Sequence, residues 1–272
     1  MKFTITVAPV ILALAVGCSD AKPANKTELK GYTTLHAAAA ANDLKAVEEL
    51  LRERTPPDTP DAEGVTALHR AARDNQLEMT ELLLRYHARP DIRTGRGWTA
   101  LHLAAMKGRI ETIEMLIRFG ADATITTPEG DNALHLAVTG GDSVVVEEIL
   151  RDVAAQASKP DAANPNAKEA LMQQANAKGA TPFQLAIEKG KWDVVGAMLS
   201  GGANPNATTK SGRLPLHEAV RAANYNAITL LMTYGAQPML RDSSGQTAFD
   251  VAAAMNRPEL TEFLARMVPA AQ

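Results

Sequence analysis

The chain has 272 residues and a formal net charge of −3, from 28 basic and 31 acidic residues. This balance argues against a nucleic-acid-binding protein, which normally carries a clustered basic face. Hydrophobic residues make up 46% of the chain but aromatic residues only 4%, which favours closely packed helices over a β-sandwich core of large side chains. Because Cys18 is the only cysteine, an internal disulfide framework and a cysteine-based zinc site are excluded.

The first residues have the pattern of a secretory signal peptide. Lys2 supplies a positive charge, and residues 5–16 are apolar apart from Thr6, a stretch shorter than the roughly 20 residues of a transmembrane helix. The segment Leu14-Ala15-Val16-Gly17-Cys18 resembles the lipobox of bacterial lipoproteins, although Ala15 stands where leucine is usual. In that family the cysteine becomes the lipidated first residue. The alternative is an ordinary cleaved signal peptide with a free thiol.

The lipobox resemblance implies an exported protein of the bacterial cell envelope. It predicts a signal peptide at residues 1–17 and a lipidated N-terminus with a polar tether at residues 18–30. Ser19, rather than aspartate, follows the cysteine, and in enteric-type sorting this implies the outer membrane. The protein would then face the periplasm and contact the membrane only through a lipid anchor at Cys18. A soluble periplasmic protein is the alternative.

A unit of 33 residues recurs along the rest of the chain. Thr66 and Thr99 lie 33 positions apart, and each is followed by Ala-Leu-His-x-Ala. The seven equivalent positions are Thr33, Thr66, Thr99, Asn132, Thr181, Leu214 and Thr247. A glycine stands two positions before each of them, which predicts a turn with positive φ. The threonines are expected to cap a helix.

These copies resemble the ankyrin repeat, whose hallmark is Thr-Pro-Leu-His-x-Ala at a period of about 33 residues. The resemblance implies an all-α fold over residues 31–268, before a short tail at 269–272. The fold would be a solenoid of stacked helix–turn–helix units with β-hairpin fingers. In this family the motif histidine hydrogen-bonds the neighbouring turn, which implies a structural role for His36, His69, His102, His135 and His217.

One insertion interrupts the array between the fourth and fifth repeats. Asn132 and Thr181 are 49 positions apart (181 − 132), which is 33 plus 16. The insertion is placed at about residues 155–174. We expect a second helix lengthened through Ala154, a loop at residues 158–161, and an added helical turn or two at residues 168–174. A contribution to binding and a neutral insertion both remain open.

The sequence predicts no enzyme. It contains no nucleophile elbow, phosphate-binding glycine loop, His-Glu-x-x-His motif or paired catalytic carboxylates. Successive motif histidines lie on successive repeats and cannot converge on one metal. We therefore expect no catalytic residue, no metal and no cofactor.

The resemblance places a protein-binding surface on the concave face, at the finger tips and the adjoining ends of the first helices. Tryptophan and arginine often dominate binding energy at interfaces. We expect a cluster of Arg93, Arg96, Trp98, Met106 and Lys107. The other candidates are Arg73, the finger residues Asp131 and Arg213, and the two charged residues that replace the motif leucine, Arg70 and Glu218. Those two charges would contact a partner or be solvated at the rim.

The predicted function is that of a non-enzymatic protein-binding module, a periplasm-facing lipoprotein that is a monomer when free. It would inhibit, or protect against, a protein such as a cell-envelope hydrolase or toxin. A scaffold or stabiliser of a periplasmic stress enzyme and a secreted effector that binds host proteins are the alternatives. No nucleic-acid partner is expected.

Overall fold

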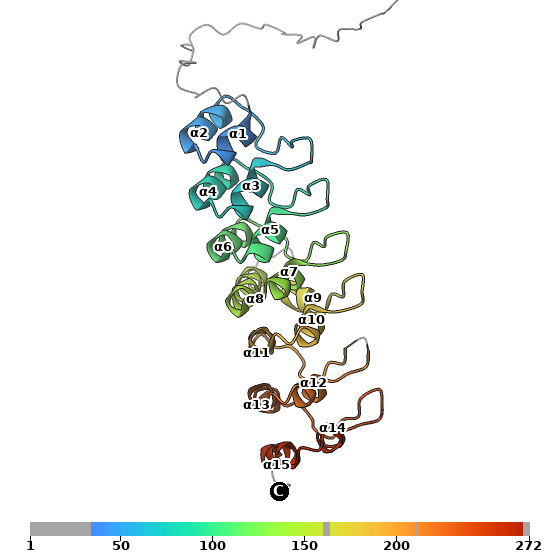
Figure 1. The fold of residues 1–272 in the computed structure, drawn as a ribbon. Helices are drawn as coiled ribbons and strands as arrows, with labels where there is room; N and C mark the ends of the chain where they lie inside the picture. Colours follow the sequence, from blue (N-terminus) through green and yellow to red (C-terminus); the bar gives the residue numbers. More distant parts are fainter. Residues whose placement is uncertain (1–33, 160–163, 210, 269–272) are drawn as a thin grey trace, which may run out of the picture.

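The computed structural model describes residues 34–159, 164–209 and 211–268, and within these ranges every regular element is a helix. Seven helix pairs stack into an elongated array, and loops project from one side of it as fingers (Figure 1). The pairs are α1 (Leu35–Ala40) and α2 (Leu44–Arg52), α3 (Ala67–Arg73) and α4 (Leu77–Arg85), α5 (Ala100–Lys107) and α6 (Ile110–Arg118), α7 (Ala133–Gly140) and α8 (Ser143–Ala157), α10 (Pro182–Glu188) and α11 (Trp192–Ser200), α12 (Pro215–Arg221) and α13 (Tyr225–Thr233), and α14 (Ala248–Ala254) and α15 (Pro258–Met267). An additional helix, α9 (Ala167–Gln173), belongs to the insertion.

The first helices of five repeats (α3, α5, α7, α10 and α14) begin with a capping box, and the third repeat shows its threonine–histidine form. The Thr99 side chain accepts a hydrogen bond from the backbone N–H of His102 (3.3 Å), and Nδ1 of His102 accepts one from the backbone N–H of Thr99 (3.0 Å). This capping box starts α5. Nε2–H of the same histidine donates to the carbonyl of Ile125 in the next loop (2.8 Å). The structural role predicted for the motif histidine is therefore confirmed.

The turns have the predicted backbone conformations, and in the described ranges three residues other than glycine and asparagine have a positive φ, namely Arg54, His87 and Ala223. Gly97 has a φ of 77°, and Gly108, which ends α5, has a φ of 67°. At the position equivalent to Gly108, Ala223 has a φ of 48°, a region that disfavours a residue with a Cβ atom. In the first repeat the helix cap is Thr34 rather than Thr33; Thr33 itself lies outside the described residues.

Stacking of the repeats forms one continuous apolar core. Small alanines on the inner helices, such as Ala104 and Ala105, are buried, and the outer helices contribute larger side chains such as Ile113 and Leu116. Full burial of each large aliphatic side chain contributes about 1.5–3 kcal/mol. At the C-terminal end the last repeat has a polar outer side, where four charged residues are exposed: Arg257, Glu259, Glu262 and Arg266.

The fingers are tight loops that contact one another along the array. In the loop at residues 94–98, the backbone N–H of Thr94 donates to the carbonyl of Trp98 and that of Gly97 to the carbonyl of Thr94, both at 2.8 Å. These two hydrogen bonds close a turn. No residue in the described ranges belongs to a β-strand, so the fingers expected as β-hairpins are turns without regular strands. The N–H of Gly95 donates to the carbonyl of Glu63 in the preceding finger (2.8 Å). Each finger therefore supports the next.

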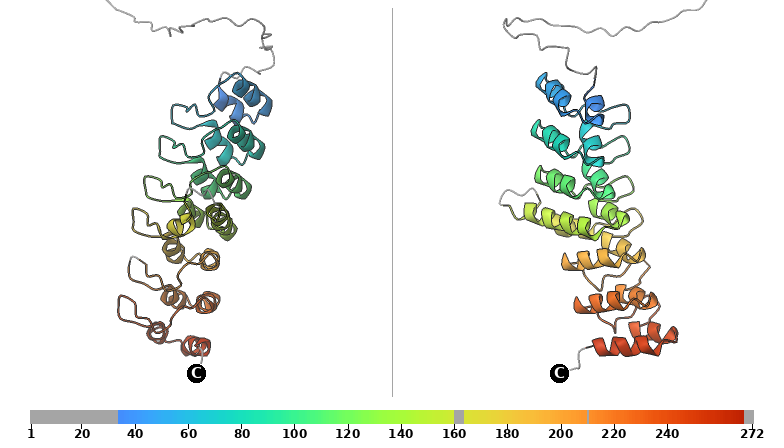
Figure 2. Two further views of the ribbon diagram at one scale, coloured as in Figure 1. Left: turned by 180° about the vertical axis from the view of Figure 1, so that it is seen from behind. Right: turned by 60° about the vertical axis from the view of Figure 1, so that its left-hand side comes forward.

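The insertion is an integral part of the fold. α8 ends at Ala157, three residues after the predicted Ala154, and projects beyond the neighbouring outer helices (Figure 2). The chain then forms α9, where Leu171 is fully buried. The side-chain amide of Asn132 donates to the carbonyl of Leu171 (2.8 Å) and to Oε1 of Gln174 (3.0 Å). The asparagine that stands in place of threonine at this cap thus caps α7 and also hydrogen-bonds the insertion.

The predicted signal peptide, lipidated Cys18, tether and C-terminal tail lie at residues 1–30 and 269–272, outside the described residues. In the part of the chain that the structure describes, no helix combines the length and apolarity needed to cross a membrane.

Candidate protein-binding groove

A hollow of about 640 Å³ opens between two neighbouring fingers, the loop before α3 and the loop before α5, which are the fingers of the second and third repeats. Its walls are residues 62–65 of the second finger and Thr94, Gly95, Arg96 and Trp98 of the third finger. Its remaining walls are side chains of the inner helices α3 and α5, namely His69, Arg70, Arg73, Leu103 and Met106. We call this hollow the 2–3 groove. Its volume falls within the roughly 300–1,000 Å³ typical of ligand pockets.

Trp98 contacts its own finger, the preceding repeat and the helix that follows it. Its backbone N–H donates to Oγ1 of Thr94 (3.1 Å), and its carbonyl accepts from Nε2–H of His69 in the preceding repeat (3.1 Å). The indole meets the His102 ring edge-on, with the centroids 6.2 Å apart and an interplanar angle of 76°. The half-buried ring is thus positioned before any partner arrives, which reduces the entropic cost of binding.

Arg70, the first charge that replaces the motif leucine, has an intramolecular partner. Its guanidinium lies 2.6 Å from Oδ2 of Asp61, and this bond lowers the pKa of that carboxyl below its ordinary value. The other Asp61 oxygen accepts the backbone N–H groups of Glu63 and Val65, both at 2.9 Å. Arg70 therefore fastens the second finger to α3, although its buried Nε has no acceptor.

Arg73 lines the same groove from the end of α3. Its Nε and one terminal nitrogen donate to the two carboxylate oxygens of Asp74, each at 2.8 Å. This bond lowers the pKa of Asp74. Both residues remain exposed, so the pair forms one polar edge of the groove.

The three other predicted cations differ in their surroundings. Arg93 donates to the carbonyls of Thr126 in the next finger (2.5 Å) and Gly97 (3.3 Å), and it does not line the groove. Arg96 and Lys107 are exposed, and within the described ranges neither side chain forms a hydrogen bond or an ion pair. The structure therefore leaves two cations of the third repeat available to a partner.

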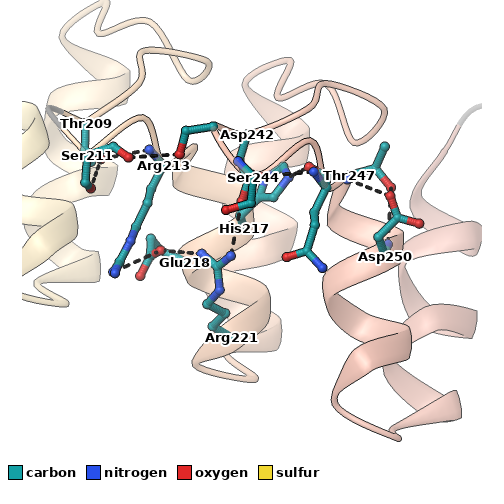
Figure 3. Close-up of polar contacts among 12 residues, drawn as sticks. Thr209, Ser211, Arg213, His217, Glu218, Arg221, Asp242, Ser244, Thr247 and Asp250 are labelled. Carbon is teal, nitrogen blue, oxygen red and sulfur yellow. Dashed lines mark hydrogen bonds and ion pairs between the residues drawn. The ribbon is translucent and has the colours of Figure 1, made fainter.

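The remaining candidates lie in other repeats and contact residues of the protein itself. Asp131 accepts a hydrogen bond from the Asn176 side chain (2.8 Å). Glu218, the second charge that replaces the motif leucine, accepts from Arg221 (2.7 Å) and lies 3.6 Å from Arg213 (Figure 3). Arg221 continues the network to Asp242 of the last finger (3.1 Å), whose side chain is only 2% exposed.

The structure thus brings together Arg70, Arg73, Arg96, Trp98 and Met106, and places Asp131, Arg213 and Glu218 elsewhere on the array. Sequence reasoning missed Glu63 and Leu103 of the groove. Leu103 carries a detectable signal, because it occupies the motif position directly after the histidine, where Arg70 and Glu218 carry their charges.

A second hollow of about 590 Å³ lies where the insertion meets the next two repeats. Met172 of α9 and Phe183 of α10 line it, together with the loop at residues 201–204. Its charged lining consists of Lys168 and Glu169, whose formal charges cancel. No excess charge therefore distinguishes this hollow as a site for an ionic partner.

The buried motif histidines have no metal-binding arrangement. No group of three or more His, Cys, Asp or Glu side chains suited to a metal ion occurs in the ranges that the structure covers. Burial lowers the pKa of His69, His102 and His135 below the ordinary value of 6.5, against the opposing effect of their carbonyl partners. These rings are therefore neutral hydrogen-bonding groups of the scaffold near pH 7.

Comparison with known proteins agrees with the architecture. The family model "Ankyrin repeats (3 copies)" matches residues 8–94, 86–161, 153–242 and 183–270. BCL-6 corepressor-like protein 1 of Homo sapiens is 40% identical over 74 residues, which are 27% of this chain and 4% of that protein. The human 2-5A-dependent ribonuclease is 39% identical over 69 residues, 25% of this chain and 9% of that protein. The match therefore spans less than a tenth of these curated relatives.

Two solved structures show the same fold at low sequence identity. The ankyrin repeat domain of human ASB11 superimposes with a TM-score of 0.62 at 24% identity, covering 89% of this chain and all of that one. The ankyrin repeat domain of Bcl-3 gives a TM-score of 0.63 at 24% identity, covering 76% of this chain and 88% of that one. With a repeat motif, a stacked helical array and a family model that together span the described residues, this chain belongs to the ankyrin-repeat family.

Proposed function

We propose that this protein is a non-enzymatic binding module that holds a protein partner in the 2–3 groove. Ankyrin repeats mediate protein–protein interaction, which supports the general class. One observation supports this location of the site. Trp98 and Met106 line the same hollow as three arginines of the second and third repeats. Large aromatic side chains beside arginines are the residue types that dominate binding energy at interfaces.

We further propose that the module acts at the bacterial cell envelope as a lipoprotein anchored through Cys18 and facing the periplasm. The support is the apolar segment at residues 5–16 followed by Gly17 and the single cysteine. Metabolic labelling with a palmitate analogue tests this proposal in cells. We expect label in the wild type and none in Cys18→Ser, and equal labelling of both would refute the anchor.

In that compartment a tethered binder suits inhibition of, or protection against, an envelope hydrolase or toxin. This role follows from the expected location together with the non-catalytic groove. A scaffold for a periplasmic stress enzyme requires the captured enzyme to remain active in the complex, whereas an inhibitor abolishes its activity. A secreted effector requires release from the membrane, which a retained lipid anchor would prevent.

The groove is tested by pull-down from an envelope extract with residues 19–272 as bait. We expect a partner that is retained by the wild type and lost from the double variant Trp98→Ala/Arg96→Ala. The matched control is Arg213→Ala, which removes a finger residue at the position equivalent to Trp98 but three repeats away. Equal recovery of the partner by wild type and double variant would refute this location of the site.

A further inference from the structure

We propose that the occupant of the 2–3 groove is an extended peptide segment with a large apolar side chain flanked by carboxylates. This inference rests on the proposed function, because it names the chemistry of the partner at that same groove. Two observations carry it: the preformed apolar floor of the groove, and two exposed cations of the third repeat, Arg96 and Lys107, that form no ion pair within the described residues.

The apolar floor consists of half-buried side chains from both fingers and from α5. Val65, Trp98, Leu103 and Met106 all line the hollow and all keep part of their surface exposed. An entering apolar side chain would bury this surface at about 25 cal/mol per Å². A volume of about 640 Å³ holds a few side chains, so it suits a segment of a partner rather than a whole domain.

The polar lining contains one cation that the protein leaves without an ion pair in the described residues. Of its three arginines, Arg70 is paired with Asp61 and Arg73 with Asp74. Arg96 is the third, and it is exposed. A carboxylate is the group that matches an arginine fork with two parallel hydrogen bonds.

Lys107, the last residue of α5, is a second cation of this repeat and lies just outside the lining of the hollow in sequence. It is exposed and lies one residue after a side chain of the groove floor. A segment whose apolar anchor contacts Trp98 and Met106 therefore meets Arg96 at the finger and Lys107 at the helix end. This arrangement favours acidic residues on both sides of the anchor.

The fifth repeat provides an internal comparison. Lys178 and Lys189 stand 82 positions after Arg96 and Lys107 (178 − 96 and 189 − 107), at the same places in the repeat, and both are exposed. The floor differs there, because buried Ala180 replaces Trp98 and Glu188 replaces Met106. Of these two repeats, only the third combines the cations with an apolar floor.

The experiment selects a library of random peptides on residues 19–272, with peptides of about twelve residues, long enough when extended to cross two repeats. We expect enrichment of peptides with Asp or Glu on both sides of Leu, Met, Phe or Trp. The affinity of an enriched peptide is then measured by fluorescence anisotropy. Absence of enrichment, or enrichment of uncharged or basic peptides, would overturn the proposal.

Two double variants with the same change in charge provide the decisive contrast. Arg96→Glu/Lys107→Glu should weaken the enriched peptide by about 10-fold or more, whereas Lys178→Glu/Lys189→Glu should change its affinity by less than about 2-fold. All four positions are exposed, so both variants should keep the fold. Equal losses would show a general charge effect and overturn the proposal.

Trp98→Ala tests the apolar floor, and we expect a loss of about 30-fold. If envelope capture depends on Trp98 and Arg96 while the selected peptides are not acidic, the proposed function stands and this inference fails. If envelope capture is independent of both residues, the proposed function fails at this groove. Vesicles with anionic phospholipid that bind with the same dependence on Arg96 and Lys107 would show lipid recognition instead and overturn the peptide assignment.

Discussion

The buried leucine of the insertion offers a test of how the two halves of the array are joined. Leu171 is the one buried residue of α9, and its carbonyl accepts the Asn132 side chain of the fourth repeat. A buried Leu→Ala substitution costs about 2–5 kcal/mol, depending on how far the site can collapse. Because α9 has only seven residues and can shift toward the gap, we expect a loss of about 2–3 kcal/mol for Leu171→Ala.

Urea unfolding followed by tryptophan fluorescence measures this loss on either side of the insertion. The chain has two tryptophans, Trp98 in the third repeat and Trp192 in the fifth. Single-tryptophan backgrounds, Trp192→Phe and Trp98→Phe, therefore report the two halves separately. Repeat arrays are stabilised by the interfaces between neighbours. We therefore expect the two unfolding transitions to separate in the Leu171→Ala variant and to coincide in the protein that keeps Leu171.

The matched control is Met172→Ala, one residue further along α9, where the side chain is only half-buried and lines the second hollow. It should cost less than half as much, since less apolar surface leaves the core. Coincident transitions with an unchanged midpoint in Leu171→Ala would refute the structural role of the insertion.

Ala223→Gly should stabilise the protein by about 0.5–1 kcal/mol, because glycine relieves the left-handed backbone (φ 48°); Ala222→Gly, at an ordinary helical φ of −75°, should destabilise it by a similar amount. Urea midpoints measure both, and equal signs would contradict the account. Burial lowers the pKa of three motif histidines, so the unfolded state binds their protons more readily than the folded state. Stability should therefore decrease as the pH falls through about 6.5, the ordinary histidine pKa, toward the lower folded-state values. The three residues are His69, His102 and His135. Replacing all three with glutamine, which at Gln184 already bonds Thr181 and Thr208 in the same way, should flatten that decrease, and an unchanged pH profile would refute the explanation.

The local rules of the repeat explain what could be predicted from sequence. A glycine recurs at the place of Gly97, which requires a positive φ, and Thr99 and His102 interact within one turn of helix. Such features depend on residues close in sequence. The insertion could be located from the excess spacing, but the end of α8 at Ala157 depends on packing that the spacing does not specify.

The charged positions show where sequence reasoning stops. A charge in place of the motif leucine indicated either a partner or solvent, yet Arg70 pairs with Asp61 and Glu218 with Arg221. The Arg221 bond to Asp242 likewise joins residues 21 positions apart in neighbouring repeats. These contacts depend on the side-chain conformations chosen across two fingers, which a repeat pattern leaves free. Trp98 was identified because its position varies on an otherwise constant frame.

Site-specific photo-crosslinking tests the central claim, that a protein partner occupies the 2–3 groove, most directly. A benzoyl-phenylalanine side chain replaces Trp98 in one variant and Tyr234 in another; Tyr234 is an exposed aromatic (42%) at the end of the outer helix α13. After irradiation of living cells, the account predicts a covalent adduct of defined mass at position 98 and none at position 234. An adduct at position 234 with none at position 98 would contradict it.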